Sequence, residues 1–455
     1  MKRWLLATGL VAVSCLTPRR SEAQPVADRY RDAASRIIAR ATKDSAAWNR
    51  IAELTETFGH RFSGSESLER AIDWTLAGMK KDALDGVRGE PVMVPRWVRG
   101  AESIELVSPR RQVLPTLGLG GSIATPPQGI TGDVMVVTSY DDLKARAAEA
   151  RGKVVLYNVP FTSYGQTVQY RGGGAVAAAR VGAVASIIRS VTPYSQRTPH
   201  TGGMAYNDSV PKIPHAAITP EDADMIARMI HRGQRVTVKL TMSARMMPDA
   251  PSRNIVAELR GTTAPDEVVV MGGHIDSWDV GRGAMDDAGG VVVAWEAIRI
   301  LKELGLRPRR TIRVVGWTNE ENGTRGGNGY RDAHRAELDK HIAAIESDGG
   351  VLKPLGFGFT GSDSAFAIVK QIGALLAGAG SGDIARGGGG ADIGPIMALG
   401  VPGLGLNVDG TRYFWYHHTD ADTVDKLDQR DVALCVATMA VMAYVLADMP
   451  ERLPR

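Results

Sequence analysis

The sequence predicts an α/β fold: a mixed, largely parallel sheet sandwiched by helices, with a second α/β domain inserted into the chain. Three observations predict it. Short apolar runs rich in valine and isoleucine end in glycine and polar residues, as the buried strands of an open α/β sheet do. Longer runs with apolar residues at helical spacing alternate with these strands. A stretch rich in Gly, Ala and Pro carries strands and a helix of its own before the main strands begin.

Residues 1–23 are predicted to be a signal peptide. Two basic residues precede an apolar core (residues 4–16) that is too short to span a membrane as a mature helix, and residues 21–23 fit a small-x-small cleavage site. The sequence therefore predicts export to the periplasm or the extracellular medium, with no membrane span. Residues 12–15 approximate a lipobox, so a lipid anchor at Cys15 is an alternative.

The composition is that of a globular protein of two or three domains, with 44% hydrophobic and 23% charged residues. The first 23 residues carry four basic residues and one acidic residue, so their removal reduces the formal charge from +4 to +1. Nothing in this charge balance indicates a nucleic-acid partner or an anionic membrane surface. Cys435 is the one cysteine beyond Cys15, so no intrachain disulfide is predicted, and its apolar surroundings predict a buried core residue.

Three segments before the insert are expected to form helices that cover one face of the sheet. They comprise residues 28–40, 45–58 and 67–79. Near residue 114 the sequence becomes rich in Gly and Pro, which indicates a domain boundary. We therefore expect one domain formed by residues 24–115 and 245–455, and an inserted domain at residues 116–244.

Acidic residues and histidines follow the main strands where each strand ends. The clusters are His274–Asp287 after the run 268–271, Thr318–Gly323 after 311–317, Glu346–Gly350 after 341–345, and Tyr416–Thr423 near a further predicted strand at 401–408. In open α/β sheets, ligands bind beyond the carboxyl ends of the strands, so these clusters are expected to form one site.

Imidazole and carboxylate together suit zinc and its transition-metal neighbours, whereas magnesium and calcium prefer oxygen ligands alone. A site for two zinc ions needs two terminal ligands for each ion and one carboxylate that bridges them. The chain offers such a set: His274 and Asp348 for one ion, Glu321 and His418 for the other, and Asp286 as the bridge. The sequence therefore predicts two zinc ions per subunit.

The segments GGHIDSWDVGRGAMDD, TNEENG, ESDGG and HHTDADT resemble the metal motifs of the di-zinc exopeptidase family that includes bacterial aminopeptidases and glutamate carboxypeptidases. The resemblance covers nearly the whole chain after the signal peptide. It implies the zinc exopeptidase fold with a protease-associated insert, and a secreted enzyme that hydrolyses dipeptides or short peptides by attack of a metal-bridging hydroxide. It also favours a homodimer. The insert would then roof the active site and limit substrate length, with a passive surface insert as the alternative.

Position by position, the resemblance gives the five ligands named above and two further roles. Glu320 becomes the general base, and Asp276 becomes the partner of the second imidazole nitrogen of His274. Of the two adjacent histidines, His418 fits the family pattern H-T-x-x-D-T, and His417 is left without a role. The chemistry agrees, because neighbouring side chains at a strand end point in different directions, so one glutamate can bind metal while the other accepts a proton from activated water.

Four residues that flank the clusters in sequence are expected to bind substrate: Arg386, Arg412, Tyr413 and Tyr416. The two arginines would hold a substrate carboxylate in bidentate fashion. The glycine-rich segment 381–394 is expected to be a flexible substrate loop, because it lacks the residues of a phosphate-binding motif.

Two alternative functions share this scaffold. A catalytically silent binding protein should lack a ligand or the base, whereas this chain has all five ligands and Glu320. A glutaminyl cyclase-like enzyme is the second alternative, with chemistry that typically uses a single metal. Whether the enzyme removes residues from the amino or the carboxyl end depends on how the pocket holds a charged terminus, and the sequence leaves this open.

Overall fold

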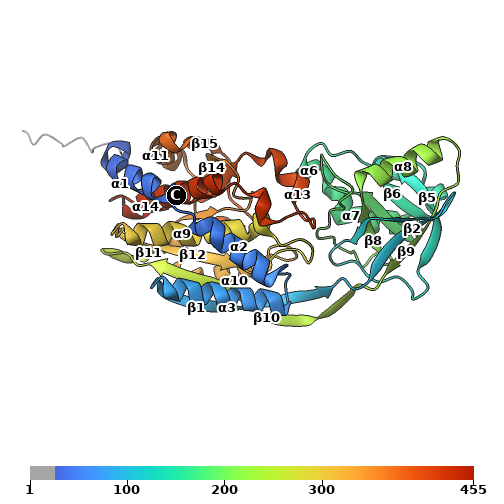
Figure 1. Ribbon diagram of the computed structural model, residues 1–455, viewed down its shortest axis with the longest axis horizontal. Coiled ribbons are helices and arrows are strands. Elements are labelled where there is room, and N and C mark those ends of the chain that lie inside the picture. The colour runs from blue at the N-terminus through green and yellow to red at the C-terminus, as the bar shows by residue number, and fades with distance from the viewer. Residues whose placement is uncertain (1–25) are drawn as a thin grey trace, which may run out of the picture.

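The computed structural model describes residues 26–455, which form two eight-stranded sheets at opposite ends of an elongated molecule (Figure 1). The predicted signal peptide and the alternative lipid anchor at Cys15 lie outside the described residues. The larger sheet has the order β1-β10-β12-β11-β13-β16-β14-β15, and the smaller has the order β3-β2-β9-β5-β6-β7-β8-β4. With helices on the faces of both sheets, the predicted α/β class is confirmed.

The larger sheet is mixed, with parallel strands at its centre. Its strands are β1 (Asp85–Val98), β10 (Arg245–Leu259), β12 (Arg310–Trp317), β11 (Ala264–His274), β13 (His341–Glu346), β16 (Gly403–Val408), β14 (Pro354–Thr360) and β15 (Asp383–Arg386). β11 pairs in parallel with β12 on one side and with β13 on the other. The carboxyl ends of these three strands therefore lie together, which is where open α/β sheets place their ligands.

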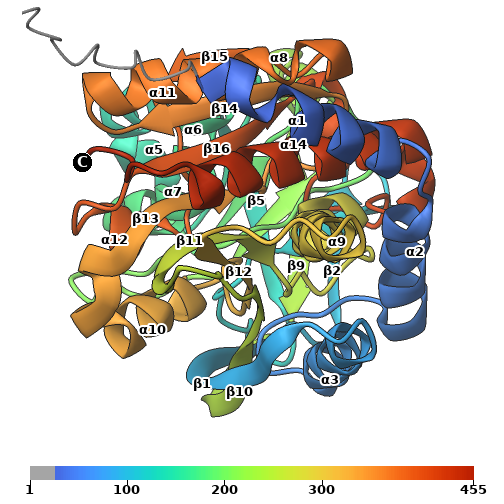
Figure 2. The ribbon, with the colours of Figure 1, turned by 90° about the vertical axis from the view of Figure 1, so that its left-hand side faces the viewer.

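Helices cover both faces of the larger sheet (Figure 2). The main hydrophobic core lies under α1 (Val26–Ala41), α2 (Ala46–Phe58), α3 (Glu66–Lys81), α9 (Gly289–Glu303), α11 (Asp363–Ala374) and α14 (Gln429–Asp448). On the other face, α10 (Arg325–Ala333) and α12 (Gly394–Met397) pack over Val270 and Trp317. The three helices predicted before the insert are confirmed as α1, α2 and α3.

α14 is the central helix of the main core. By length and composition it is apolar enough to cross a membrane, and it alone among the described residues passes that test, but 83% of its most apolar stretch is buried inside the protein. Cys435 lies on this helix, is fully buried, and places its Sγ 3.1 Å from the carbonyl oxygen of Leu352. The cysteine is therefore a core residue, as predicted.

The smaller unit, which we call the insert (residues 102–242), is a second α/β sandwich. Its strands are β2 (Glu102–Ser108), β3 (Gln112–Leu114), β4 (Thr116–Gly118), β5 (Ile130–Val137), β6 (Val154–Tyr157), β7 (Ala185–Arg189), β8 (His215–Ile218) and β9 (Thr237–Met242). Its helices are α4 (Tyr140–Ala145), α5 (Ala147–Ala150), α6 (Tyr164–Thr167), α7 (Gln169–Arg180) and α8 (Pro220–His231). α7 packs through its alanines on one face of the sheet, and α8 covers the other face.

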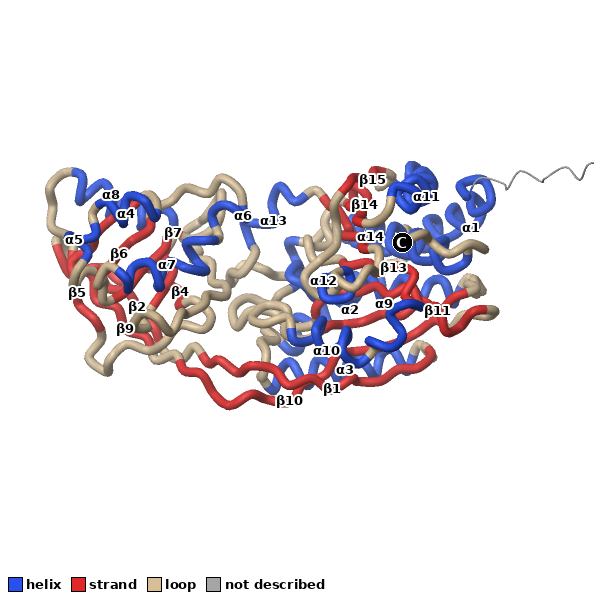
Figure 3. Tube along the Cα trace, turned by 180° about the vertical axis from the view of Figure 1, so that it is seen from behind, coloured by secondary structure: helices blue, strands red, loops and turns tan. Residues whose placement is uncertain are grey.

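The smaller sheet begins earlier in the chain than the boundary expected at residue 116. β2 and β3 precede that residue, yet β2 pairs with β9, with Glu102 opposite Met242. The Gly- and Pro-rich segment supplies β4 and a loop inside the insert, so its composition does not mark the boundary. The chain passes between the two units in β1 and β10, a long antiparallel ribbon that runs along one side of the molecule (Figure 3).

Candidate metal centre

Three neighbouring strand ends bring four of the predicted site residues together. His274 is the last residue of β11 and is completely buried. Glu320 and Glu321 lie in the turn that follows β12, and Asp348 follows the end of β13. The register places Trp317, the last residue of β12, opposite His274. The order of strands in the sheet thus joins clusters that are far apart in the sequence.

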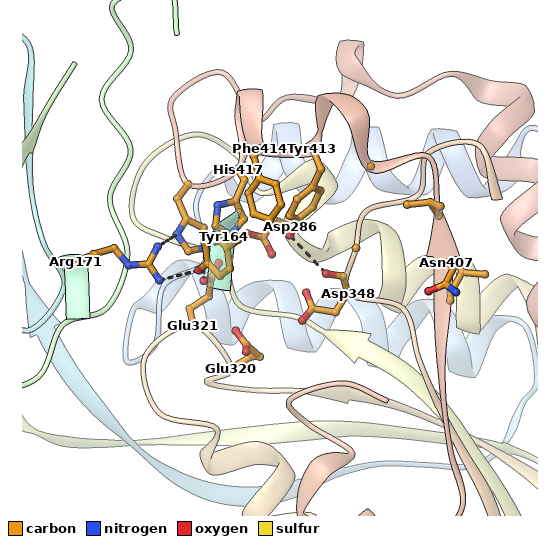
Figure 4. A pocket seen from close by; sticks show the side chains of 15 residues that line it. Tyr164, Arg171, Asp286, Glu320, Glu321, Asp348, Asn407, Tyr413, Phe414 and His417 are labelled. Atoms are coloured by element: carbon orange, nitrogen blue, oxygen red, sulfur yellow. Dashed lines mark hydrogen bonds and ion pairs between the residues drawn. The ribbon is translucent and has the colours of Figure 1, made fainter. Parts of the chain in front are cut away.

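The five predicted ligands form two groups that share Asp286, and Figure 4 shows Asp286, Glu321 and Asp348 among them. In one group, His274 Nε2 lies 3.2 Å from Asp286 Oδ1 and 3.3 Å from Asp348 Oδ1. In the other, His418 Nε2 lies 3.1 Å from Asp286 Oδ2 and 3.0 Å from Glu321 Oε2. Each oxygen of Asp286 therefore faces a different group, as a bridging carboxylate would.

These residues fit zinc in spacing and in chemistry. Two ligand atoms on one tetrahedral zinc, each bonded at about 2.0 Å, lie about 3.3 Å apart. The four contacts within the two groups span 3.0–3.3 Å. Glu321 Oε1 is also buried without a hydrogen-bond partner among the described residues, and a bound cation would stabilise this atom. The mixture of nitrogen and oxygen donors favours zinc over magnesium or calcium.

The pKa values of the protein groups show how strongly the cluster holds positive charge. Burial alone would lower the pKa of His274, but hydrogen bonds to Asp286 and Asp348 raise it well above its ordinary value. His418 behaves in the same way: burial lowers its pKa, and the charge of Glu321 with the neighbouring hydrogen bonds raises it to about 9. Burial would raise the pKa of Asp286, but the two histidines hold it well below the usual range. Zinc would replace the protons on both imidazoles and meet the same carboxylates.

Asp422 fixes the loop that carries the shared carboxylate. Its side chain is buried and accepts hydrogen bonds from the main-chain N–H groups of Ala284, Met285 and Asp286 at 3.1, 2.8 and 3.1 Å. Burial raises its pKa to about 7 despite these bonds. In the sequence, Asp422 was visible only as part of a motif; the structure gives it a positioning role.

Two further buried side chains hold the same loop. Arg61 is completely buried and donates to the carbonyl oxygens of Ile275, Arg282 and Gly283. Asp287 accepts from the N–H groups of Gly290 and His274 at 2.9 and 3.1 Å, so it ties the first turn of α9 to the end of β11 and both of its oxygens are occupied. The sequence carried no recognisable signal for Arg61.

Asp276 holds the turn that carries Glu320 and Glu321. Its carboxylate accepts from their main-chain N–H groups at 3.1 and 3.3 Å. Its main-chain carbonyl lies 3.0 Å from His274 Nδ1, whereas Oδ1 lies 3.7 Å from that nitrogen. The imidazole contact thus runs mainly through the carbonyl, and the carboxylate predicted for it is occupied by the turn. Burial, reinforced by the charge of Asp348, raises the pKa of Glu320 well above that of an ordinary carboxyl group.

A cavity of about 490 Å³ lies over this cluster, and both units of the protein line it. The main unit contributes metal-ligand candidates, Glu320 and several residues between Leu406 and His418. The insert contributes Tyr164 from α6 and Arg171 from α7 (Figure 4). Sequence reasoning missed these two residues, because neither lies near a chemical motif.

Of the four predicted substrate residues, the structure places Tyr413 in the cavity wall, with its hydroxyl 3.5 Å from the carbonyl oxygen of Asp348. Arg386 lies elsewhere, paired with the exposed Asp363 and stacked on the ring of Phe366. Arg412 is exposed, and neither it nor Tyr416 lines the cavity. The segment 381–394, expected as a flexible loop, contains the edge strand β15 and the start of α12. Closeness in sequence to a cluster therefore did not predict closeness in space.

His417, which had no predicted role, is part of the cavity wall. Its ring stacks on that of His418 with 3.5 Å between the ring centroids, and its Nε2 lies 3.5 Å from Asp286 Oδ2. Burial and the neighbouring His418 hold the pKa of His417 well below its ordinary value. His418 remains the better ligand candidate, because it is closer to Asp286 and also contacts Glu321.

An α/β sheet that gathers two histidines and three carboxylates at its strand ends, under a cavity with a further glutamate, defines a metal-dependent hydrolase. Residues 254–443 match the model of Peptidase family M28. Over 429 residues the chain is 48% identical to carboxypeptidase Q from Xenopus laevis, covering 94% of this chain and 92% of the relative. The chain belongs to peptidase family M28.

Solved structures agree. The crystal structure of a peptidase M28 precursor from Shewanella amazonensis SB2B matches with a TM-score of 0.91 and 37% identity over 94% of this chain and 99% of that one. The zinc aminopeptidase BSAP from Bacillus subtilis matches with a TM-score of 0.68 over 89% and 95% of the two chains, and at 20% identity this likeness shows the fold. The protein is a metallo-exopeptidase of this family, similar to carboxypeptidase Q, and the predicted family is confirmed.

Proposed function

We propose that the protein is an exported exopeptidase that hydrolyses dipeptides or other short peptides with two zinc ions per subunit. The sharing of Asp286 between the two groups of ligands is the observation that carries this proposal. His274 and Asp348 would hold one ion, and Glu321 and His418 the other. The cavity volume of about 490 Å³ suits a short peptide.

When bound, zinc lowers the pKa of a coordinated water and polarises a carbonyl oxygen. Glu320 would accept the proton of the attacking water and pass it to the leaving amine, because its raised pKa suits a group that both takes up and releases a proton. Asp276 would keep Glu320 and Glu321 in place through their main-chain N–H groups. These two adjacent glutamates would thus have different roles: Glu321 would bind metal, and Glu320 would transfer the proton.

The insert would limit substrate length from the opposite side of the cavity. Its α6 contacts α13 (Tyr413–Tyr416) of the main unit, where the ring of Tyr164 stacks on Phe414 with 4.9 Å between centroids. Thr192 of the insert also donates to the carbonyl oxygen of Phe414 at 2.6 Å. These contacts support a roofing role for the insert, which we propose to be a protease-associated domain. Export, the lipid anchor and the homodimer stay predictions from the sequence.

The proposal is tested by amino-acid release from a free dipeptide by the purified protein, before chelation, after chelation and after zinc is restored. We expect release that is lost with zinc and returns with it, at two zinc ions per chain by elemental analysis. No release by folded protein that carries two zinc ions would contradict the proposal. Cyclisation of a peptide with an amino-terminal glutamine would then support the glutaminyl cyclase-like alternative, and its absence would support the binding protein.

A further inference from the structure

The insert contains a second cavity, which we call the α7 trough. Its volume is about 750 Å³, within the range of small-molecule sites. Residues of α4, of α7 and of the loop 205–207 line it. Among the described residues it shares no lining residue with the cavity over the metal centre, and no acidic side chain lines it.

The face of α7 that lines the trough is apolar, although it is not packed against the rest of the protein. Gly172, Gly173, Val176 and Ala177 lie on this face, and each is only partly buried. The opposite face of the helix is buried against the smaller sheet. A helix at a protein surface normally carries polar residues on its outer face. The trough therefore presents apolar surface that the described residues leave uncovered.

The packing around Gly172 does not require a glycine there. Glycine inside a helix is destabilising relative to alanine, so it usually marks a close approach of another group. A Cβ at Gly173 or Gly174 would lie 3.0–3.2 Å from neighbouring side chains, which gives these two glycines such a reason. A Cβ at Gly172 would have no neighbour within 4 Å outside its own stretch of helix among the described residues. The bare backbone at Gly172 leaves room for a ligand to lie directly against the helix.

Two cations line the same trough. Lys144 of α4 and Arg180 of α7 are both exposed. The carboxylates near them in the chain, Asp142 and Glu149, pair with Arg146 instead, and neither Lys144 nor Arg180 forms an ion pair within the described part of the chain. An anion at this rim would therefore meet two positive charges and no acidic lining residue.

The walls of the trough are held in place before any ligand arrives. Tyr140 donates its hydroxyl to the first carbonyl oxygen of α7 at 2.7 Å, and Tyr206 donates to the carbonyl oxygen of Ile213 at 2.7 Å. The main-chain N–H of Ala205 donates to the carbonyl oxygen of Gly172 at 3.1 Å, which ties the loop to the helix. Because both hydroxyl protons are used, the two tyrosines offer apolar ring surface to a ligand. A preorganised site of this kind binds with little loss of side-chain entropy.

The dimensions of the trough suit a single apolar chain. From Gly172 to Arg180 the lining follows eight residue steps of helix, about 12 Å along the axis, which is close to the length of an extended chain of about ten carbons. Twelve residues line the trough, whereas a stable protein–protein interface takes about 20–30 residues from each side. The trough is therefore sized for one acyl chain and is too small for a protein partner.

We propose that the α7 trough binds a single-chain anionic amphiphile, of the class of medium-chain fatty acids. Its tail lies along the helix face from Gly172 to Ala177, and its head group lies at Lys144 and Arg180. This binding site goes beyond the proposed peptidase function and does not depend on it.

The test measures binding of decanoate to the zinc-loaded full-length protein by isothermal titration calorimetry, below the micelle concentration of the ligand. We expect one site per chain and a negative heat-capacity change, because apolar surface is buried. Kd should fall about 10-fold from octanoate to decanoate, since two more methylene groups are buried. Decanol should bind about 5-fold more weakly than decanoate, because it cannot pair with the two cations. Decyltrimethylammonium should bind more weakly still.

Gly172→Leu fills the trough from its helix side. We expect Kd for decanoate to rise about 30-fold or more, since the leucine side chain takes the place of several methylene groups of the tail. Tm should not fall, because a glycine inside a helix is replaced where its side chain has room. Gly165→Leu is the matched control: a Cβ at Gly165 also has no neighbour within 4 Å, and Gly165 does not line the trough, so Kd should stay unchanged.

The head-group position is tested by Lys144→Gln combined with Arg180→Gln. This double variant should raise Kd for decanoate about 5-fold and leave Kd for decanol unchanged. Arg228→Gln is the matched control, because Arg228 is exposed on α8 and does not line the trough. An unchanged Kd for decanoate in the double variant would show that the two cations do not hold the head group, and would overturn the proposal.

Three other results would overturn it as well. They are no saturable binding of decanoate by the wild-type protein, an unchanged Kd in folded Gly172→Leu, and equal affinity of the wild type for decanoate and decanol. Self-association of the wild type that Gly172→Leu abolishes, measured by analytical ultracentrifugation, would indicate that a second copy covers the trough instead. If Gly172→Leu fails to fold, the series of chain lengths and the double variant carry the same test.

Discussion

The two walls of the cavity are built in different ways. The wall from the main unit consists of acidic residues and histidines at strand ends, and main-chain hydrogen bonds hold its loops in position. The wall from the insert consists of Arg171 and Tyr164, and aromatic packing on Phe414 holds it. Main-chain anchoring keeps the first wall rigid, as metal chemistry requires, whereas side-chain packing lets the second wall vary without disturbing the metal centre.

The largest effect expected on the first wall follows removal of the metal. Chelation should abolish peptide hydrolysis completely, and zinc should restore it, because zinc supplies both the activated water and the polarised carbonyl. Chelation should also lower Tm, since the buried carboxylates then lose their counter-ions. Differential scanning calorimetry with parallel rate measurements checks both results. A protein that keeps its activity after all zinc has been removed would contradict the metal centre.

Glu320→Gln should lower kcat by about 1000-fold or more while zinc content stays at the wild-type level, because an amide cannot accept the proton of water. Glu321→Gln is the matched variant one residue away, and it should lose zinc as well as activity. Elemental analysis and steady-state kinetics separate the two. Near-normal turnover by Glu320→Gln would refute the assignment of the base.

Asp422→Asn tests the anchoring of the first wall. An asparagine presents an NH₂ group where one carboxylate oxygen now accepts from main-chain N–H groups, so donor would face donor. We expect a loss of about 1–3 kcal/mol in the free energy of unfolding and a loss of about 10- to 100-fold in zinc affinity. Denaturant unfolding and zinc competition with a chelator check these values. Unchanged zinc affinity would show that the loop of Asp286 holds its position without Asp422.

The difference between the walls also explains what the sequence could predict. The strand ends, with His274, Glu321 and Asp348, could be read because buried β-branched runs and polar residues at their ends are local patterns, and parallel strands bring such ends together. The cavity wall from the insert could not be predicted from the sequence, because Tyr164 and Arg171 reach the cavity only through the docking of one unit against the other. Arg386 illustrates the converse: it follows a cluster in sequence and points to Asp363 on the surface.

The prediction of where the insert begins was wrong for a related reason. A Gly- and Pro-rich segment indicates irregular backbone, and the structure has such backbone there, but it lies within the insert. The partner of β2 is β9, which stands far along the chain, and pairing over such a distance leaves no local signal. Composition predicted an inserted unit, but it could not find the strand β2 that begins the smaller sheet.

Phe414→Ala should weaken the second wall without disturbing the first. It removes the stacking partner of Tyr164, so we expect KM for free dipeptides to rise up to about 10-fold with kcat nearly unchanged, in line with about 0.5–1.5 kcal/mol for an aromatic pair. Tyr194→Ala is the matched control, since Tyr194 packs on Trp415 outside the cavity wall, and it should change KM by less than about twofold. A fall in kcat with loss of zinc would show that the two walls are not independent.

The last prediction concerns stability in mild acid, where each unit contains a buried histidine. Burial lowers the pKa of His215 in the insert and of His341 in the main sheet to about 4, from an ordinary value near 6.5. As pH falls from 6.5 to 4, the unfolded chain binds these protons first, so stability present above pH 6.5 is lost within that window. A difference of one in pKa corresponds to about 1.4 kcal/mol, so each histidine changes the free energy of unfolding by at most about 3 kcal/mol.

His215→Gln should therefore flatten the pH dependence of unfolding by about one proton between pH 6.5 and 4, and His341→Gln should do the same for the main unit. His215 Nδ1 lies 2.6 Å from Ser186 Oγ, and its Nε2 lies 3.2 Å from the carbonyl oxygen of Tyr170 next to Arg171. The free energy of unfolding of each variant is subtracted from that of the wild type at each pH. This difference cancels the contribution of the carboxylates that titrate in the same range. If the insert and the main unit unfold separately, each variant should change only its own transition in calorimetry; a shared transition would mean that the contacts between the walls make one cooperative unit of the two sheets.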